Sequence, residues 1–422
     1  MQLAARRPDS ESFDLDGHVG AVLDLRLEPG AGWPVAVAFS GGGDSLALLL
    51  ASAAWARRTG RPLLVLTVDH RLRSESAGWT DACAETAHRL GLAFQALSWE
   101  GDKPATGLPA AARLARHRLL AGAARSAGAR VILMGHTADD VLEAAAMRQA
   151  GATTPTPAPW SPSPVWPDGR GLFLLRPLLD VRRATLREAL ERRGESWIDD
   201  PANADLRYAR PRARRLLAAG AIGPGTPAVD APPSAALAWQ TVGDGGGGLS
   251  LPRTALREVA HATAQRFVAA ACLCTAGTDR PPSAARAARL TERLRATELF
   301  TASLAGARVE AQGATVRFLR EPGEAQRGGL STLRVAAGET VVWDGRFAIT
   351  ADRPGEIRPL AGLGGRLPPP QRAWRQSLPA GARDAAPAMI DSAGEIACPV
   401  GETLTYARLL AACGAVTCEP TS

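Results

Sequence analysis

The chain has 422 residues, of which 46% are hydrophobic and 22% charged, a composition typical of a folded protein with two or three domains. No apolar run is long enough to span a bilayer and no secretion signal opens the chain, so we expect a cytoplasmic protein that does not enter membranes. The net charge of +7 comes from arginine, since Lys103 is the one lysine. It favours a polyanionic partner such as nucleic acid, although a codon bias towards arginine would give the same surplus. The six cysteines form no CxxC pair, which argues against a zinc ribbon, an iron–sulfur cluster or a disulfide scaffold.

The first part of the chain alternates short apolar runs with longer helix-like segments. Short all-apolar strands that alternate with helices indicate a parallel sheet covered on both faces, so we predict an α/β fold. The predicted strands cover residues 34–39, 62–68 and 129–135, and the predicted helices cover residues 46–58, 77–91 and 182–194.

Two stretches rich in proline interrupt this pattern. We expect no regular structure in residues 152–170, because proline removes backbone donors, and we place a domain boundary in the Pro/Gly-rich residues 221–233. Beyond the boundary, a mainly helical region ends in a predicted hairpin around Gln312-Gly313, and a β-rich region follows. The expected domains are therefore residues 1–220, 234–320 and 325–422.

The sequence SGGGDS, at residues 40–45, directly follows the first predicted strand. Glycines between a strand and a helix let backbone N–H groups approach a phosphate at the positive end of the helix. The alternative interpretation is a tight turn in which Asp44 caps the helix. The lysine of a Walker A loop and the glycine spacing of a dinucleotide fold are both missing. Because a carboxylate beside phosphates requires a bridging cation, the segment favours a magnesium nucleotide as ligand.

This segment resembles the SGGxDS loop of the N-type ATP pyrophosphatases, which split ATP between its α and β phosphates. Other segments are similar to one family among them, the tRNA(Ile)-lysidine synthetases, so the resemblance implies a Rossmann-like N-terminal catalytic domain. They are VDHRLRSES at 68–76, AARLARHRLL at 111–120, GHTADDVLEAAAMR at 135–148, and RPLLDVRRATL with the later WIDDPANADLRYARPRARRLL. In this chain His117 stands where the family usually has Tyr, Ala144 where it has Thr, and the Pro-rich insert (residues 152–170) where an RG-x-G-x-x-GL segment is expected.

The resemblance implies that lysine is joined to the 2-position of the wobble cytidine of an isoleucine tRNA with a CAU anticodon, through an adenylated cytidine. ATP would be converted to AMP and pyrophosphate, with Mg²⁺ as the metal and free lysine and this tRNA as the other substrates. The oligomeric state is left open. A tRNA thiolation enzyme of the same superfamily and an inactive nucleotide-binding module remain as alternatives, the latter because of the lost segment.

Each expected site residue has a structural alternative. Asp139 and Asp140 could cap a helix, Glu143 and the arginines could lie on solvated helix faces, and His70 and His136 could be packed neutral side chains instead of contacts to nucleotide or bases for the lysine amine. The expected catalytic residues are Asp44, Asp139 and Asp140, with Asp44 and Asp140 as metal ligands. The expected ATP-binding residues are Ser40, Gly41, Gly42, Gly43, Asp44, Ser45, Asp69, His70 and His136. The expected lysine-binding residues are Glu143 and Arg113, and the expected tRNA-binding residues are Arg207, Tyr208, Arg210, Arg212 and Arg214.

Overall fold

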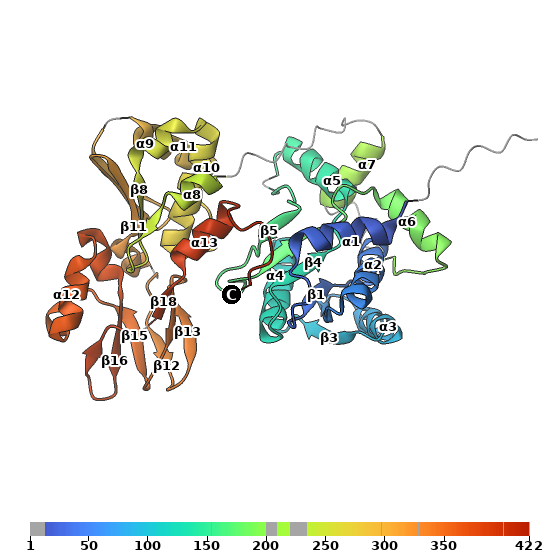
Figure 1. Cartoon of the computed structure of the whole chain (residues 1–422), viewed down its shortest axis with the longest axis horizontal. Coiled ribbons are helices and arrows are strands. Elements are labelled where there is room, and N and C mark those ends of the chain that lie inside the picture. The colour runs from blue at the N-terminus through green and yellow to red at the C-terminus, as the bar shows by residue number, and fades with distance from the viewer. Residues whose placement is uncertain are drawn as a thin grey trace, which may run out of the picture. The chain divides into compact units, whose positions relative to one another are not determined.

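The computed structural model describes residues 13–152, 154–199, 209–219, 234–296, 298–327, 329–399 and 401–421. The chain separates into two compact units, which are labelled by element in Figure 1. Unit 1 comprises Met1–Asp230 and Thr417–Ser422, and unit 2 comprises Ala231–Val416. The expected division into three domains stays a prediction.

Unit 1 is built on a six-stranded sheet in the order β3-β2-β1-β4-β6-β5, in which β5 alone pairs antiparallel. Its central strands, β1 and β4, are apolar, and all of their residues but the half-buried Ala38 are buried, because helices cover both faces of a parallel sheet. The strands are β1 (Val35–Ala38), β2 (Leu63–Asp69), β3 (Ala93–Ser98), β4 (Val131–Met134), β5 (Trp160–Pro162) and β6 (Phe173–Leu175).

The helices of unit 1 connect these strands and pack on the sheet. Helix α2 begins inside the Gly-rich loop and ends at Gly60, whose φ of 73° is the left-handed conformation that glycine adopts freely. Figure 1 shows α1 lying against α2. The helices are α1 (Leu15–Arg26), α2 (Gly43–Thr59), α3 (Ser76–Arg89), α4 (Leu108–Ser126), α5 (Ala138–Gln149), α6 (Arg183–Arg192) and α7 (Ala209–Ala218). All six strands and helices predicted with explicit bounds in this unit are confirmed.

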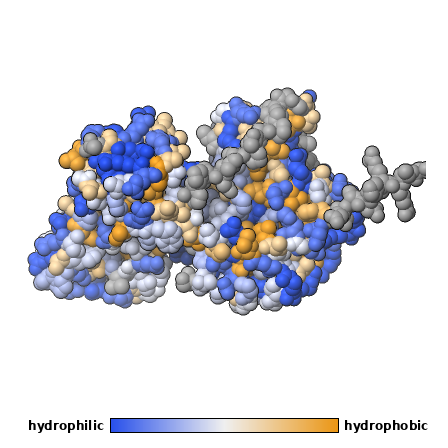
Figure 2. Space-filling model, turned by 45° about the horizontal axis from the view of Figure 1, so that its top comes forward, coloured by the Kyte–Doolittle hydropathy of each residue, from blue (hydrophilic) through white to orange (hydrophobic). Residues whose placement is uncertain are grey.

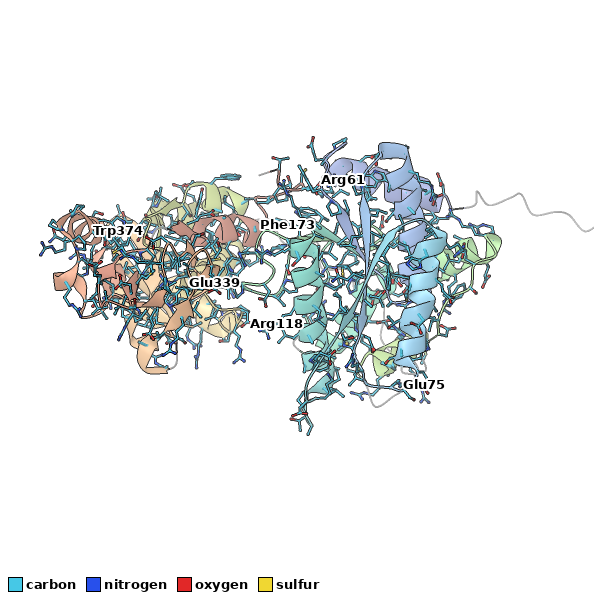
Figure 3. The ribbon with its side chains drawn as sticks, turned by 90° about the horizontal axis from the view of Figure 1, so that it is seen from below. Arg61, Glu75, Arg118, Phe173, Glu339 and Trp374 are labelled. Carbon is cyan, nitrogen blue, oxygen red and sulfur yellow. The ribbon has the colours of Figure 1, made fainter. Side chains whose placement is uncertain are left out.

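The Pro-rich insert corrects one expectation, because it contains a strand. Residues Trp160–Pro162 form β5 at the edge of the sheet, where a proline is tolerated because its missing N–H is not needed for a further strand. The indole of Trp160 stacks on Phe173 of β6, with ring centroids 4.8 Å apart (Phe173 is labelled in Figure 3). The insert therefore continues the sheet of unit 1.

Unit 2 contains a five-stranded sheet with helices packed on it and two smaller sheets. The hairpin predicted around Gln312-Gly313 is confirmed by β10 and β11, and the region expected to be mainly helical also supplies the five-stranded sheet, in the order β7-β8-β11-β10-β9. The helices are α8 (Ala235–Trp239), α9 (Arg253–Glu258), α10 (His261–Ala276), α11 (Ala284–Arg295), α12 (Pro369–Ser377) and α13 (Thr405–Ala412), with 3-10 turns at Pro322–Arg327, Gly364–Arg366 and Ala380–Ala385. The strands are β7 (Val242–Gly243), β8 (Leu249–Pro252), β9 (Phe300–Leu304), β10 (Ala307–Gln312), β11 (Thr315–Arg320), β12 (Leu333–Val335), β13 (Thr340–Trp343), β14 (Phe347–Thr350), β15 (Gly355–Pro359), β16 (Pro387–Asp391), β17 (Ile396–Ala397) and β18 (Gly401–Thr403).

The C-terminal segment (residues 417–421) returns to unit 1 after the chain has built unit 2. The Glu419 carboxylate is fully buried and accepts hydrogen bonds from Arg61 Nη2 at 2.6 Å, Trp33 Nε1 at 2.8 Å and the Glu28 backbone at 2.9 Å. Arg61, which lies between α2 and β2, is labelled in Figure 3. The guanidinium of Arg130 lies over the Trp33 ring and donates to the Pro420 carbonyl. The segment is thus an integral part of unit 1.

The surface of each unit is mixed in character. Figure 2 shows hydrophilic and hydrophobic residues interspersed on the displayed face. Within the described ranges, no helix combines the length and the apolar character needed to cross a membrane.

Candidate active site

The Gly-rich loop (residues 40–45) lies at the carboxyl end of β1, where the strand order reverses between β1 and its neighbour β4. Ligands of open parallel sheets bind at such a switch point. Within the loop, the Ser45 hydroxyl donates to the Gly42 carbonyl at 2.8 Å and accepts from the Ser40 backbone at 3.2 Å. The Ser45 hydroxyl therefore stabilises the loop, and α2 begins within it.

Close packing explains two glycines at this point. Gly41 has a φ of 78°, and a Cβ there would lie 2.4 Å from the Ile198 side chain, whose backbone N–H donates to the Gly41 carbonyl. A Cβ on Gly135, after β4, would lie 3.0 Å from the Cα of Ser45. The loop after β4 thus packs against the backbone of the Gly-rich loop. Trp197 and Ile198 cover the Gly-rich loop from a third segment.

Three of the expected carboxylates converge on one residue, Arg183 at the start of α6. Its Nε donates to Asp44 at 2.8 Å, its Nη1 to Glu143 at 3.3 Å, and its Nη2 lies 3.7 Å from Asp140. Burial lowers the pKa of this guanidinium, but the carboxylates, Asp44 foremost, outweigh burial and raise it overall. Burial raises the pKa of the Asp44 carboxyl despite its bond to Arg183. The structure therefore brings Asp44, Asp140 and Glu143 together around a cation.

Asp139 and Asp140, at the N-terminus of α5, make different contacts. Asp140 Oδ2 accepts from the Thr137 backbone at 2.9 Å in a capping box, so the capping interpretation is correct for this oxygen, while its Oδ1 faces Arg210. Asp139 accepts from the Arg182 side chain and from the Arg183 backbone at 2.7 Å, which joins α5 to α6. Asp44 does not cap α2, because Gly42 is the N-cap.

Glu143 differs from the solvated glutamate of the alternative interpretation. Its side chain is 1% exposed, and Oε1 accepts from Arg214 Nε at 2.5 Å. Its Oε2 is buried and has no hydrogen-bond partner among the described residues. A buried carboxylate oxygen without a partner is costly, which makes it a candidate to bind a cationic group.

The expected tRNA-binding arginines fall on two faces of α7, which lies beside α5 in Figure 1. Arg210 and Arg214, four residues apart, face the carboxylates Asp140 and Glu143. Arg212 is exposed on the other face together with Arg215. Arg207 and Tyr208 lie outside the described residues.

A second set of cations lines α4 and the strand ends beside it. Arg116 and Arg176 have their pKa values lowered to about 10 by burial and by the charge of Arg113, and burial together with these arginines lowers the pKa of His117 to about 2. Burial lowers the pKa of Arg113 as well, with Arg210 adding to the effect. The Arg116 Nε and His117 Nε2 atoms are buried without partners among the described residues. This surplus of positive charge suits an anionic ligand.

The remaining expected ATP-binding residues lie at the same edge of the sheet. Asp69 ends β2 and accepts from the Arg71 backbone at 2.7 Å, and His70 follows it, with its pKa lowered by burial and by Arg116. His136 follows β4 and is 8% exposed. The packed neutral state considered for both histidines agrees with the direction of these shifts.

Sequence reasoning missed the role of Arg183 and Arg176. Both lie in the quoted RPLLDVRRATL segment, but no pattern within that segment distinguishes an inward-facing arginine from a surface one. The sequence did place several acids at one predicted site without an assigned cation. Because buried carboxylates require cationic partners, that surplus could have indicated an inward-facing arginine.

The donor chemistry of the site fits the implied Mg²⁺. Asp44 and Asp140 lie in the first turns of α2 and α5, the helices that follow the adjacent strands β1 and β4, and both face Arg183. The described residues contain no group of three or more His, Cys, Asp or Glu side chains arranged to hold a metal. Mg²⁺ is usually held by one or two carboxylates together with substrate phosphates, so two suffice.

The fold and this site define a PP-loop protein that uses ATP, and a PP-loop domain profile matches residues 26–220. The chain is 49% identical over 378 residues to the tRNA(Ile)-lysidine synthase of Caulobacter vibrioides, with 89% of each chain covered. The chain belongs to the tRNA(Ile)-lysidine synthase family.

Other comparisons are more distant. The tRNA(Ile)-lysidine synthase of Hyphomonas neptunium is 41% identical over 214 residues, which cover 50% of this chain and 56% of that one. Among solved structures, the U34-tRNA thiolase of Methanococcus maripaludis, with its [4Fe-4S] cluster, is 16% identical at a TM-score of 0.40 and covers 48% of this chain and 70% of that one. A similarity at that level supports no conclusion about function.

Proposed function

We propose that this protein ligates free lysine to the 2-position of the wobble cytidine in an isoleucine tRNA with a CAU anticodon. ATP is converted to AMP and pyrophosphate through an adenylated cytidine. The observation that carries this proposal is the convergence of Asp44, Asp140 and Glu143 beside the Gly-rich loop at the β1/β4 switch point. Family membership supplies the substrates.

The loop and α2 bind the phosphates of ATP in this proposal. The N-terminus of α2 offers backbone N–H groups and the positive end of the helix dipole. Asp44 and Asp140 would hold Mg²⁺, which neutralises charge on the pyrophosphate leaving group when bound. Arg183 already lies between Asp44 and Asp140. When Mg²⁺ binds, the guanidinium would either move away or remain beside the metal as a second positive charge.

Lysine binds at Glu143 in this proposal. The unpartnered Glu143 Oε2 accepts a hydrogen bond from a lysine ammonium, and Arg113 on α4 binds the lysine carboxylate. An ammonium at this oxygen would satisfy the buried acceptor that the protein leaves open.

The tRNA contacts the exposed arginines of α7, including Arg212 and Arg215. Arg210 and Arg214 face the site, where they contact Asp140 and Glu143.

The thiolation alternative has little support in the geometry. Cys83 lies close to Gly41, but it is 1% exposed, and burial raises the pKa of its thiol to about 11. A thiol in that state is a poor nucleophile at neutral pH. The described residues also contain no metal-binding group of cysteines.

The test offers isoleucine and methionine tRNAs, both with a CAU anticodon, together with ATP, Mg²⁺ and labelled lysine, followed by mass analysis of the wobble nucleoside. We expect lysine in the isoleucine tRNA and none in the methionine tRNA. Incorporation should weaken as salt is raised, because phosphate contacts carry tRNA binding. Sulfur incorporation would favour the thiolase, and the absence of both lysine label and pyrophosphate release would favour an inactive nucleotide-binding module.

A further inference from the structure

Arg176 connects the Pro-rich insert to the active-site histidine after β4. It directly follows β6 and is 7% exposed. Its Nε donates to His136 Nδ1 at 3.3 Å, and its Nη1 donates to the Ala158 carbonyl at 2.6 Å and to Ser161 Oγ at 3.1 Å. The insert therefore supplies two acceptors that fix the guanidinium against the imidazole.

This contact determines the tautomer of His136. A guanidinium has donors only and stays protonated, so the Nδ1 atom that faces it must present a lone pair. A neutral imidazole with a free Nδ1 carries its proton on Nε2. His136 can thus donate a hydrogen bond from Nε2.

The surrounding charges keep the imidazole neutral. Burial lowers its pKa well below the usual range, and the cations that face it, Arg176 after β6, Arg116 and Arg113 on α4, and Arg210 on α7, lower it further. His117 on α4 is also nearby and is itself neutral. Since Nδ1 is already engaged and Nε2 is protonated, neither nitrogen is available to take a proton from the lysine amine.

His136 follows β4 beside the Gly-rich loop. Its neighbour Gly135 packs directly on the backbone of Asp44 and Ser45 in the Gly-rich loop. We propose that His136 acts as a neutral Nε2–H donor to a phosphoryl oxygen of bound ATP, that Arg176 is its positioning residue, and that Ala158 and Ser161 of the insert hold Arg176. This inference rests on the proposed function for the identity of the ligand, but its tautomer component does not.

The first experiment is ¹⁵N NMR of the histidine-labelled full-length protein without ligand. The chain has six histidines, so the His136→Gln spectrum assigns the signal by its absence. We expect a protonated Nε2, an unprotonated Nδ1 and no titration between pH 5 and 8, the range in which an ordinary histidine titrates. A reversed tautomer, or a titration in that range, would overturn the proposal whether or not the protein makes lysidine.

The second experiment measures pyrophosphate release with tRNA, ATP and Mg²⁺. Glutamine places an N–H donor near the position of Nε2, so His136→Gln should keep the rate within about tenfold, whereas His136→Leu should lose about a hundredfold or more, as when an oxyanion donor is removed. Equal losses in both variants would reject the donor role. His88→Gln, on the exposed end of α3, is the matched control and should leave the rate unchanged.

A third comparison tests the insert. Ser161→Ala removes one acceptor from Arg176 and should lower the rate several-fold at unchanged ATP affinity, with a shifted His136 Nδ1 signal. Ser163→Ala, whose side chain lies against Gly169, should change neither. If Ser161→Ala moves neither the signal nor the rate, the insert does not position His136.

Discussion

Arg183 holds three carboxylates at the point where the phosphates and the lysine are expected to meet. Burial raises the pKa of the Asp44 carboxyl even though Arg183 donates to it, so its ionised form is destabilised in the folded protein. The three carboxylates therefore favour binding of a further cation at the site.

Asp44→Asn should abolish adenylation and leave the fold intact. The amide keeps the size and one oxygen of the side chain but cannot act as an anionic metal ligand, and Arg183 retains Asp140 and Glu143. We expect pyrophosphate release to fall by about a hundredfold or more, by analogy with the loss of one transition-state donor. Asp14→Asn, at the N-cap of α1, is the control. Wild-type release from Asp44→Asn would remove Asp44 from the metal site.

Glu143→Gln should spare adenylation more than lysine transfer. The charged acceptor of the proposed ammonium contact is lost, and hydrogen bonds to charged groups contribute about 1.5–3 kcal/mol, or roughly ten- to a hundredfold in rate. Pyrophosphate release without lysine and lysine incorporation measure the two steps separately. Glu85→Gln, exposed on α3, serves as control. A matching decrease in both steps would show that Glu143 does not select lysine.

At this scale the acids were predictable and their partners were not. The motifs place Asp44 and Asp140 in segments that follow strands, and place Glu143 on the same helix face as Asp140. The structure brings the three side chains together around Arg183. Arg183 and Arg176 act through contacts with residues far away in the chain, which no local pattern encodes.

Helix α2 provides a test at the level of an element, because glycines in the left-handed region lie at both of its ends. Gly41→Ala and Gly60→Ala should each lose about 1–2 kcal/mol of unfolding free energy from backbone strain. Only the Cβ at Gly41 would also meet Ile198, at 2.4 Å, whereas nothing lies within 4 Å of Gly60. We expect ATP affinity to fall at least about tenfold in Gly41→Ala, as displaced loop donors are lost, and to persist in Gly60→Ala. Calorimetric titration with an ATP analogue measures this difference. Equal affinities would mean that Ile198 does not shape the loop.

The elements that were predicted are those with uniform surroundings. β1 and β4 are apolar throughout because both of their faces are buried, and α2 is long and rich in Ala and Leu. β3 lies at the sheet edge and mixes exposed and half-buried residues, so its sequence lacks that signal. β5 forms although it contains Pro162, because pairing with β6 requires few donors from an edge strand.

At the scale of the whole molecule, unit 1 depends on a carboxylate that follows unit 2 in the chain. Glu419→Gln leaves the buried Arg61 guanidinium without its counter-charge, and breaking a buried pair in this way costs about 3–5 kcal/mol. Urea denaturation should show this loss, and Glu402→Gln, exposed on β18 of unit 2, should not. Identical midpoints for both variants would mean that the C-terminal segment contributes little. No sequence pattern predicts the pairing of Arg61 with Glu419, because an isolated glutamate has no feature that distinguishes it from a solvated one.

The pairing of Arg61 with Glu419 joins positions 358 residues apart. A ribosome adds about 5–20 residues per second, so roughly 18–72 s pass between the synthesis of the two. The guanidinium lacks the Glu419 carboxylate for all of that interval, although the last strand of the six-stranded sheet, β6, ends at Leu175 and is made long before Glu419. Unit 1 is thus translated first but gains its last segment only after unit 2 has been made, and a chain that stops within unit 2 leaves Arg61 without the Glu419 carboxylate.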